Sequence, residues 1–172
     1  VSTGRLIQRT AAEHIIPVTL ELGGKSPQLV FDDADIDAAL PFLVNAGIQN
    51  AGQTCSASSR ILVQRGVYDQ VVARMAERYC ALRAGPALSD LSVGPLVSAR
   101  QKEIVEGFIA KGADLNLVAR GQVVTDAPAG GAYVAPALFA DVPADNTLAQ
   151  DEIFGPVQVI IPFEDEAEAL AI

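Results

Sequence analysis

The chain has 172 residues, half of them hydrophobic, and a formal net charge of -9 from 21 acidic and 12 basic residues. This composition suits one globular domain with a buried core and excludes an intrinsically disordered chain. The sequence contains no basic stripe and no apolar run near the roughly 18 residues that cross a bilayer, which argues against nucleic acid and membrane as partners. Its two cysteines suggest neither a disulfide framework nor a zinc site, so we expect a reducing, cytoplasmic setting and no bound metal.

Strands and helices are expected to alternate along the chain. Short branched and apolar runs predict strands, and apolar residues spaced by three and four predict helices. In chain order we expect a helix over Gly4–Ile15, strands over Val18–Leu22 and Gln28–Phe31, a helix over Ile36–Asn50, a strand over Arg60–Gln64, helices over Tyr68–Leu82 and Ser98–Lys111, a strand over Leu115–Ala119, short extended pieces over Tyr133–Pro136 and Leu138–Ala140, a strand over Val157–Ile161 and a helix over Glu164–Ile172. The alternation predicts an α/β layer fold with a mostly parallel sheet. Both ends resemble interrupted elements, so we expect a piece of a larger protein.

The two cysteines differ in their settings. Cys55 lies in a polar loop of small residues, Asn50–Arg60, between a predicted helix and a predicted strand. Small neighbours would let a substrate carbon approach the sulfur, which suits a nucleophile, although most single thiols are inert. Cys80 lies on or beside the apolar face of the helix Tyr68–Leu82, so we interpret it as a structural residue.

Glu21 is unusual because it stands among apolar residues just before two glycines. It is either a carboxylate that faces water or forms an ion pair, or one held at the end of a strand, where open α/β sheets place their chemistry. In the second case it could act as a general base. His14, the single histidine, is interpreted as a helix-end residue, and Asp32–Asp35 as the acidic start of a helix rather than a metal site.

Three motifs in one order carry a resemblance to a known family. Leu20–Pro27 (LELGGKSP), Gly52–Arg60 (GQTCSASSR) and Glu152–Val157 (EIFGPV) resemble the glutamate, cysteine and cofactor-ribose motifs of the aldehyde dehydrogenase superfamily. The similarity runs through nearly all of the chain, and the three motifs together are highly specific. It implies a three-layer α/β catalytic domain, with residues 1–17 as the end of the dinucleotide-binding domain and residues 18–172 as a catalytic domain truncated at its C-terminus.

The resemblance implies catalytic roles for two residues. Cys55 would attack the aldehyde carbon to give a thiohemiacetal, and hydride transfer to NAD or NADP would leave a thioester. Glu21 would then take a proton from the water that hydrolyses this thioester. A glutamate at this position argues against the coenzyme A-acylating branch of the family, so the expected product is a free carboxylic acid.

The resemblance also implies cofactor contacts. Glu152 would accept hydrogen bonds from the nicotinamide-ribose hydroxyls, and Phe154 would pack near the nicotinamide. The Leu22 carbonyl would meet the carboxamide, and Gly4 would be the last glycine of the pyrophosphate loop. Most of that loop and the asparagine that helps to bind the oxyanion would lie upstream of this chain, so we expect the isolated piece to be inactive as a dehydrogenase.

Two other functions remain open. Cys55 and Glu21 could cleave activated esters without a cofactor, or the fold could serve as a non-catalytic assembly module. For the full-length protein the resemblance implies a small-molecule aldehyde as substrate and a homo-oligomer, either a dimer or a tetramer. The choice of aldehyde and the choice between NAD and NADP are not predicted.

Overall fold

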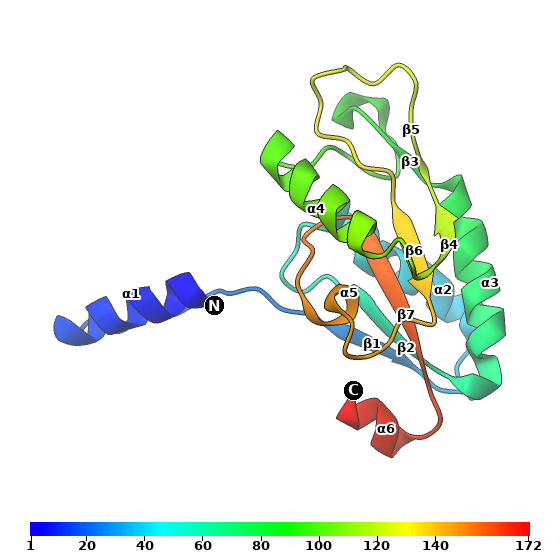
Figure 1. Cartoon of the computed structure of the whole chain (residues 1–172), viewed down its shortest axis with the longest axis horizontal. Coiled ribbons are helices and arrows are strands. Elements are labelled where there is room, and N and C mark those ends of the chain that lie inside the picture. The colour runs from blue at the N-terminus through cyan, green and yellow to red at the C-terminus, as the bar shows by residue number, and fades with distance from the viewer.

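A five-stranded sheet forms the middle layer of the computed structural model, which describes residues 1–172 (Figure 1). Its strand order is β1 (Pro27–Val30), β2 (Arg60–Gln64), β7 (Val157–Phe163), β6 (Ala137–Ala140) and β4 (Asn116–Arg120). Neighbouring strands from β1 to β6 pair in parallel, and β4 pairs antiparallel to β6 with a register shift between Leu117 and Ala119. The predicted mostly parallel sheet is therefore confirmed.

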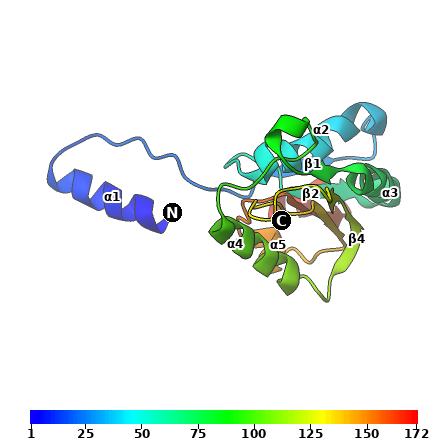
Figure 2. The ribbon, with the colours of Figure 1, turned by 90° about the horizontal axis from the view of Figure 1, so that it is seen from above.

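Helices cover both faces of the sheet (Figure 2). Two of them, α2 (Ile36–Ile48) and α3 (Arg65–Ala81), lie on one face, and α4 (Ala99–Lys111) and α5 (Thr147–Gln150) lie on the other. The remaining elements are α1 (Ser2–Glu13), the 3-10 turns η1 (Gln49–Gly52) and η2 (Ala87–Ser89), the short parallel pair β3 (Arg83–Ala84) and β5 (Gln122–Val123), and α6 (Glu166–Ala171). Helix α1 stands apart from the layered body and joins it through an extended segment (Figure 1).

Side-chain caps fix where several helices begin. Asp35 accepts a hydrogen bond from the Ala38 amide at the start of α2, and Ser98 accepts one from the Gln101 amide at the start of α4. Such caps satisfy amides that the first helical turn leaves unpaired. The prediction that the acidic run Asp32–Asp35 starts a helix is confirmed at Asp35.

One hydrophobic core joins the layers. On α2, the residues predicted to share an apolar face are all buried: Leu40, Leu43, Val44 and Ile48. They meet the nearly inaccessible side chains of Ile61 on β2 and Ile160 on β7. This layer holds the carboxyl ends of α2 and the start of β2 in place, and the loop with Cys55 lies between them.

The structure corrects two predictions. Val18–Leu22 forms no strand, because no neighbouring strand pairs with it and the sheet begins only at Pro27. Cys80 is exposed, although we expected a structural residue on or beside the buried face of α3. It follows the fully buried Tyr79 on α3, and one helical step of about 100° turns its side chain outward.

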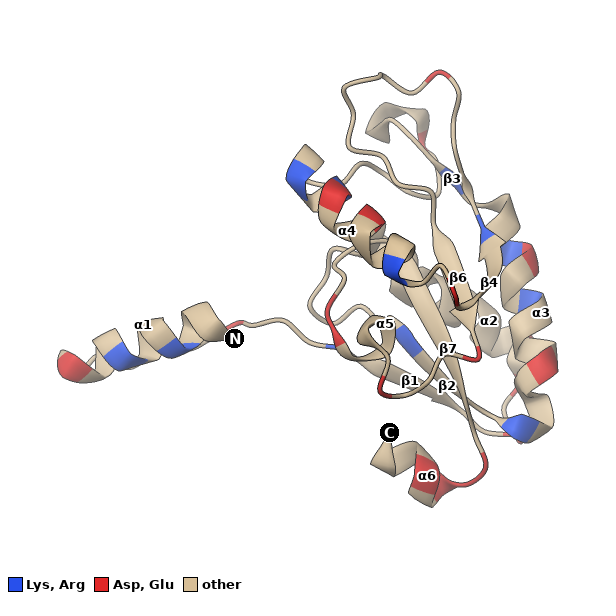
Figure 3. Cartoon of the chain, in the orientation of Figure 1, with Lys and Arg blue, Asp and Glu red and all other residues tan.

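Charged residues of both signs are spread over the body, and the basic ones form no stripe (Figure 3). Helix α3 carries Arg74 and Arg78 beside Glu77, and Arg74 pairs with Asp37 of α2. No helix combines the length and the apolar character that a membrane crossing requires.

Candidate active site

The side-chain amides of Asn50 and Gln53 order the loop that carries Cys55. The Asn50 side chain donates to the Gln53 carbonyl at 3.0 Å, and the Gln53 side chain donates back to the Asn50 carbonyl at 3.0 Å. Gln53 also accepts a hydrogen bond from the Val97 amide at 2.8 Å. Cys55 lies two residues after Gln53 and is exposed, so these hydrogen bonds hold the loop that presents the cysteine to solvent.

The cysteine loop packs directly against the turn that contains Glu152 and Phe154. Gly52 has a φ of 75°, and a Cβ at this position would overlap the Gly155 carbonyl. Only glycine combines this backbone conformation with so close an approach. The Gln101 side chain of α4 holds the same turn from the other side, because it donates to the carbonyl of Ile153 at 3.2 Å and to that of Phe154 at 3.0 Å.

The two glycines after Glu21 bring the third motif to the same place. A Cβ on Gly23 would overlap the Glu152 carboxylate, so this carboxylate rests on the bare backbone of Gly23. A Cβ on Gly24 would lie 3.2 Å from the Cys55 carbonyl oxygen. All three sequence motifs contribute to one narrow pocket, whose lining consists of Gly24, Gly52, Thr54, Ala57, Ser59, Glu152, Ile153, Phe154 and Gly155.

Glu21 and Leu22 lie on the extended segment between α1 and β1, just before the glycine pair that meets the other two motifs. Both residues are exposed, and Gly4 is buried where a Cβ would lie 2.8 Å from the Leu22 side chain. Glu21 does not line the pocket and no hydrogen bond fixes its carboxylate, so its role at the site stays a prediction.

The residue after Gly24 of the pocket is a lysine whose ammonium is buried. The Lys25 ammonium is shielded from solvent and has no hydrogen-bond partner. Burial, with a further contribution from the charge of Arg60, lowers the pKa of Lys25 to about 8, whereas Asp151 and Glu152 act in the opposite direction. Arg60 donates to the Lys25 carbonyl at 3.1 Å and to the Ile172 carbonyl at 3.3 Å.

Gln158 on β7 is a supporting residue that the sequence pattern did not identify. It is fully buried, and its amide donates to the carbonyl of Ser58 at 2.7 Å and to that of Leu43 at 3.0 Å. It also accepts a hydrogen bond from the Tyr79 hydroxyl. Gln158 therefore ties the cysteine loop to α2 and α3, and its polar side chain within a nearly all-apolar strand was the available signal.

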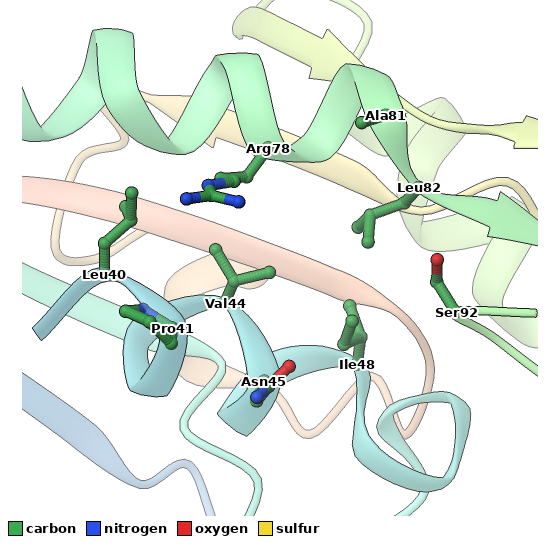
Figure 4. Close-up of a pocket in the computed structure, with 9 residues that line it drawn as sticks. All are labelled: Leu40, Pro41, Val44, Asn45, Ile48, Arg78, Ala81, Leu82 and Ser92. Atoms are coloured by element: carbon green, nitrogen blue, oxygen red, sulfur yellow. The ribbon is translucent and has the colours of Figure 1, made fainter.

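A larger pocket lies elsewhere, between α2 and α3 (Figure 4). It has a volume of about 410 Å³, an apolar floor that includes Leu40, Val44 and Leu82, and the Arg78 guanidinium directed over it. None of the three motifs contributes to it. Pocket size therefore does not mark the site here, and the convergence of three motifs does.

Comparisons with known proteins agree with this geometry. The family model "Aldehyde dehydrogenase family" matches residues 1–172. Betaine aldehyde dehydrogenases from Cereibacter sphaeroides and Rhizobium leguminosarum are 44% and 41% identical over 99% of this chain, and the chain spans only 35% and 36% of their lengths. The chain thus corresponds to about a third of these relatives.

Solved structures give the same result. A Burkholderia cenocepacia protein assigned to this family superposes with a TM-score of 0.97 at 53% identity, over 99% of this chain and 36% of its own. An aldehyde dehydrogenase from Mycobacterium tuberculosis in complex with NAD+ superposes with a TM-score of 0.88 at 44% identity, over 99% of this chain and 36% of its own. The chain belongs to the aldehyde dehydrogenase family.

Proposed function

We propose that the full-length protein containing this chain oxidises an aldehyde to a carboxylic acid with NAD+ or NADP+, and that Cys55 is its nucleophile. One observation carries the proposal. The exposed Cys55 follows a locked turn at the meeting point of three motifs, and Glu21 and Glu152 belong to the other two. A thiol, a general base and an acceptor-only carboxylate are the groups that this reaction requires from the chain.

The chemistry of the proposed reaction follows from these groups. The Cys55 thiolate attacks the aldehyde carbon, and the carbonyl oxygen becomes an oxyanion that nearby amides can stabilise. The bound dinucleotide supplies the hydride acceptor. Once the substrate carbon has lost its hydride, Cys55 carries a thioester, and Glu21 takes a proton from the water that cleaves it. The carboxylic acid leaves, and the thiol is restored.

The residues present fit a dinucleotide ribose. The Glu152 carboxylate is exposed and rests on Gly23, which has no side chain to compete for the space above the backbone. A carboxylate only accepts hydrogen bonds, which matches a vicinal pair of hydroxyl donors. We assign Phe154 to the nicotinamide, Leu22 to the carboxamide and Gly4 to the pyrophosphate loop. NAD+ is the first cofactor to test, since several solved neighbours are described as NAD+ complexes.

The domain assignment belongs to the same proposal. Residues 1–17 are assigned to the dinucleotide-binding domain and residues 18–172 to the catalytic domain. The separation of α1 from the layered body supports this division (Figure 1). In the family the oxyanion asparagine lies in a part that this chain does not contain, so the chain alone is expected to lack dehydrogenase activity.

The test uses the full-length protein with NAD+, NADP+ and a panel that contains acetaldehyde, benzaldehyde and betaine aldehyde. Cys55→Ala is expected to abolish reduction of the cofactor, and Glu21→Gln is expected to lower it by at least about a hundredfold through slow deacylation. Cys80→Ala is the matched control, because Cys80 is also exposed but lies on α3 and outside the three motifs. A Cys55→Ala variant that retains wild-type activity would refute the proposal.

Thiol esterase activity is a second candidate, supported by the presence of Cys55 and Glu21 in the same chain. Acyl transfer to water needs a nucleophile and a base but no hydride acceptor. With 4-nitrophenyl acetate the chain is expected to release a burst of nitrophenol without any cofactor. The burst should vanish in Cys55→Ala and persist in Cys80→Ala, and an unchanged burst in Cys55→Ala would exclude this activity.

A further inference from the structure

Lys25 stabilises nothing that the structure shows. Its ammonium is fully shielded and has no hydrogen-bond partner, and only one other buried side-chain polar atom, Oε1 of Gln28, shares this condition. Removing a charge from water without a partner is costly, and proteins usually pair or neutralise such groups. An unpaired buried lysine lowers the stability of the fold, so its role lies in function rather than in stability.

The charged groups around Lys25 indicate what this role is. Arg60 on β2 is a like charge, and it is already engaged with the carbonyls of Lys25 and Ile172. The only acidic side chains that act on the ammonium are Asp151 and Glu152, which follow α5. Neither forms an ion pair with it within 4.0 Å, so the attraction acts at longer range through partly buried space.

Glu152 is the member of this pair that faces the cofactor site. Its carboxylate covers Gly23, two residues before Lys25, and Asp151 adds a like charge directly beside it. Lys25 is a cation whose charge acts on this carboxylate, and their attraction favours the position of the carboxylate over the glycine.

We propose that Lys25 is a positioning residue for cofactor binding, which acts through Glu152 by keeping its carboxylate seated on Gly23. The inference rests on the proposed role of Glu152 toward the dinucleotide ribose. It extends that role to a side chain that makes no contact with the ribose itself. Lysine is suited to this position because it carries a compact charge on a long stem, and an apolar side chain of similar shape would remove the attraction that acts between this charge and Glu152.

Direct binding of NAD+ to the full-length protein tests the inference, by quenching of protein fluorescence or by calorimetry. Lys25→Met is expected to raise the Kd for NAD+ by about tenfold, which corresponds to about 1.4 kcal/mol of lost attraction. Lys25→Arg should recover part of the affinity. In a Glu152→Gln background, which removes the charge that Lys25 holds, Lys25→Met should change the Kd less than twofold. Because the pKa of Lys25 is lowered to about 8, Lys25 loses its charge as the pH rises above this value. The affinity of the wild-type protein for NAD+ should therefore fall above about pH 8, and this dependence should be absent in Lys25→Met.

The outcomes separate this inference from the proposed function. If the wild-type protein binds NAD+ and Lys25→Met binds equally well, or if Lys25→Met weakens binding to the same extent in the Glu152→Gln background, the inference is refuted and the proposed reaction stands. If the wild-type protein binds neither NAD+ nor NADP+, both fail. A circular dichroism spectrum of each variant shows whether it is folded, and Lys25→Gln replaces Lys25→Met where the latter does not fold.

Discussion

Replacement of Gln158 by leucine should destabilise the chain strongly, because one buried amide satisfies three partners. Gln158→Leu keeps most of the side-chain volume but removes both donors to Ser58 and Leu43 and the acceptor for Tyr79. Each of the three lost bonds costs about 1 kcal/mol, and stranded buried groups add about 1–3 kcal/mol, so the free energy of unfolding should fall by about 4–6 kcal/mol. Tyr79→Phe removes a single bond and should cost about 1 kcal/mol.

Urea unfolding followed by circular dichroism measures these effects on the 172-residue chain. The double variant Tyr79→Phe with Gln158→Leu should be more stable than the sum of the single effects predicts, by about 1 kcal/mol, because the tyrosine hydroxyl is no longer left unpaired. Gln70→Leu on the exposed face of α3 is the matched control and should change stability by less than about 0.5 kcal/mol. A Gln158→Leu cost below about 1 kcal/mol would refute the assignment of Gln158 as the tie between the cysteine loop and the helices.

Three further variants probe the site. Lys25→Met should raise the free energy of unfolding at pH 7 by about 1–3 kcal/mol in urea titrations. The pKa of Lys25 lies near 8 in the folded state and at its usual 10.5 when unfolded, so the wild-type chain should gain stability as the pH rises between these values. Lys25→Met should not show this gain. Gly23→Ala should displace the Glu152 carboxylate and weaken NAD+ binding by the full-length protein at least about tenfold. The control Gly107→Ala, in open space on α4, should leave binding unchanged and add about 0.5–1 kcal/mol of stability. Equal NAD+ affinities of Gly23→Ala and the wild-type protein would contradict the placement of Glu152. Gly52→Ala should cost about 2–4 kcal/mol in the same urea assay, because its φ of 75° and the opposing backbone both exclude a side chain, and a stable variant would show that the two turns do not meet.

Hydrophobic spacing predicted the elements whose burial is set by a single face. The strand over Arg60–Gln64 is predicted with the observed bounds, and α2 buries the expected residues, because periodic apolar side chains have only one stable way to pack. Val18–Leu22 failed the same test, since branched residues form a strand only where a neighbour offers unpaired backbone groups, and none lies beside this segment. Strand formation depends on distant partners that a local pattern does not contain.

The site was predicted from motifs rather than from spacing. Motif order placed Cys55 and Glu152 in one region, and the structure brings their loops together through the glycines at positions 23, 24 and 52. Burial of Lys25 and the hydrogen bonds of Gln158 could not be read from the sequence, because they depend on contacts between residues more than 30 positions apart. The apolar spacing of α3 did not decide whether Cys80 lies on the buried face or beside it, and the structure places it beside that face, exposed.

The central claim is that Cys55 becomes covalently acylated during aldehyde oxidation. Mass spectrometry of the full-length Glu21→Gln variant, mixed with NAD+ and an aldehyde that the wild-type protein oxidises, tests it most directly, because slow hydrolysis should allow the thioester to accumulate. Trypsin separates the two cysteines of this chain into the peptides 26–60 and 79–83. We predict that the acyl mass appears on the peptide with Cys55 and disappears in Cys55→Ala; an acyl group on any other peptide, or turnover without acylation of Cys55, would contradict the account.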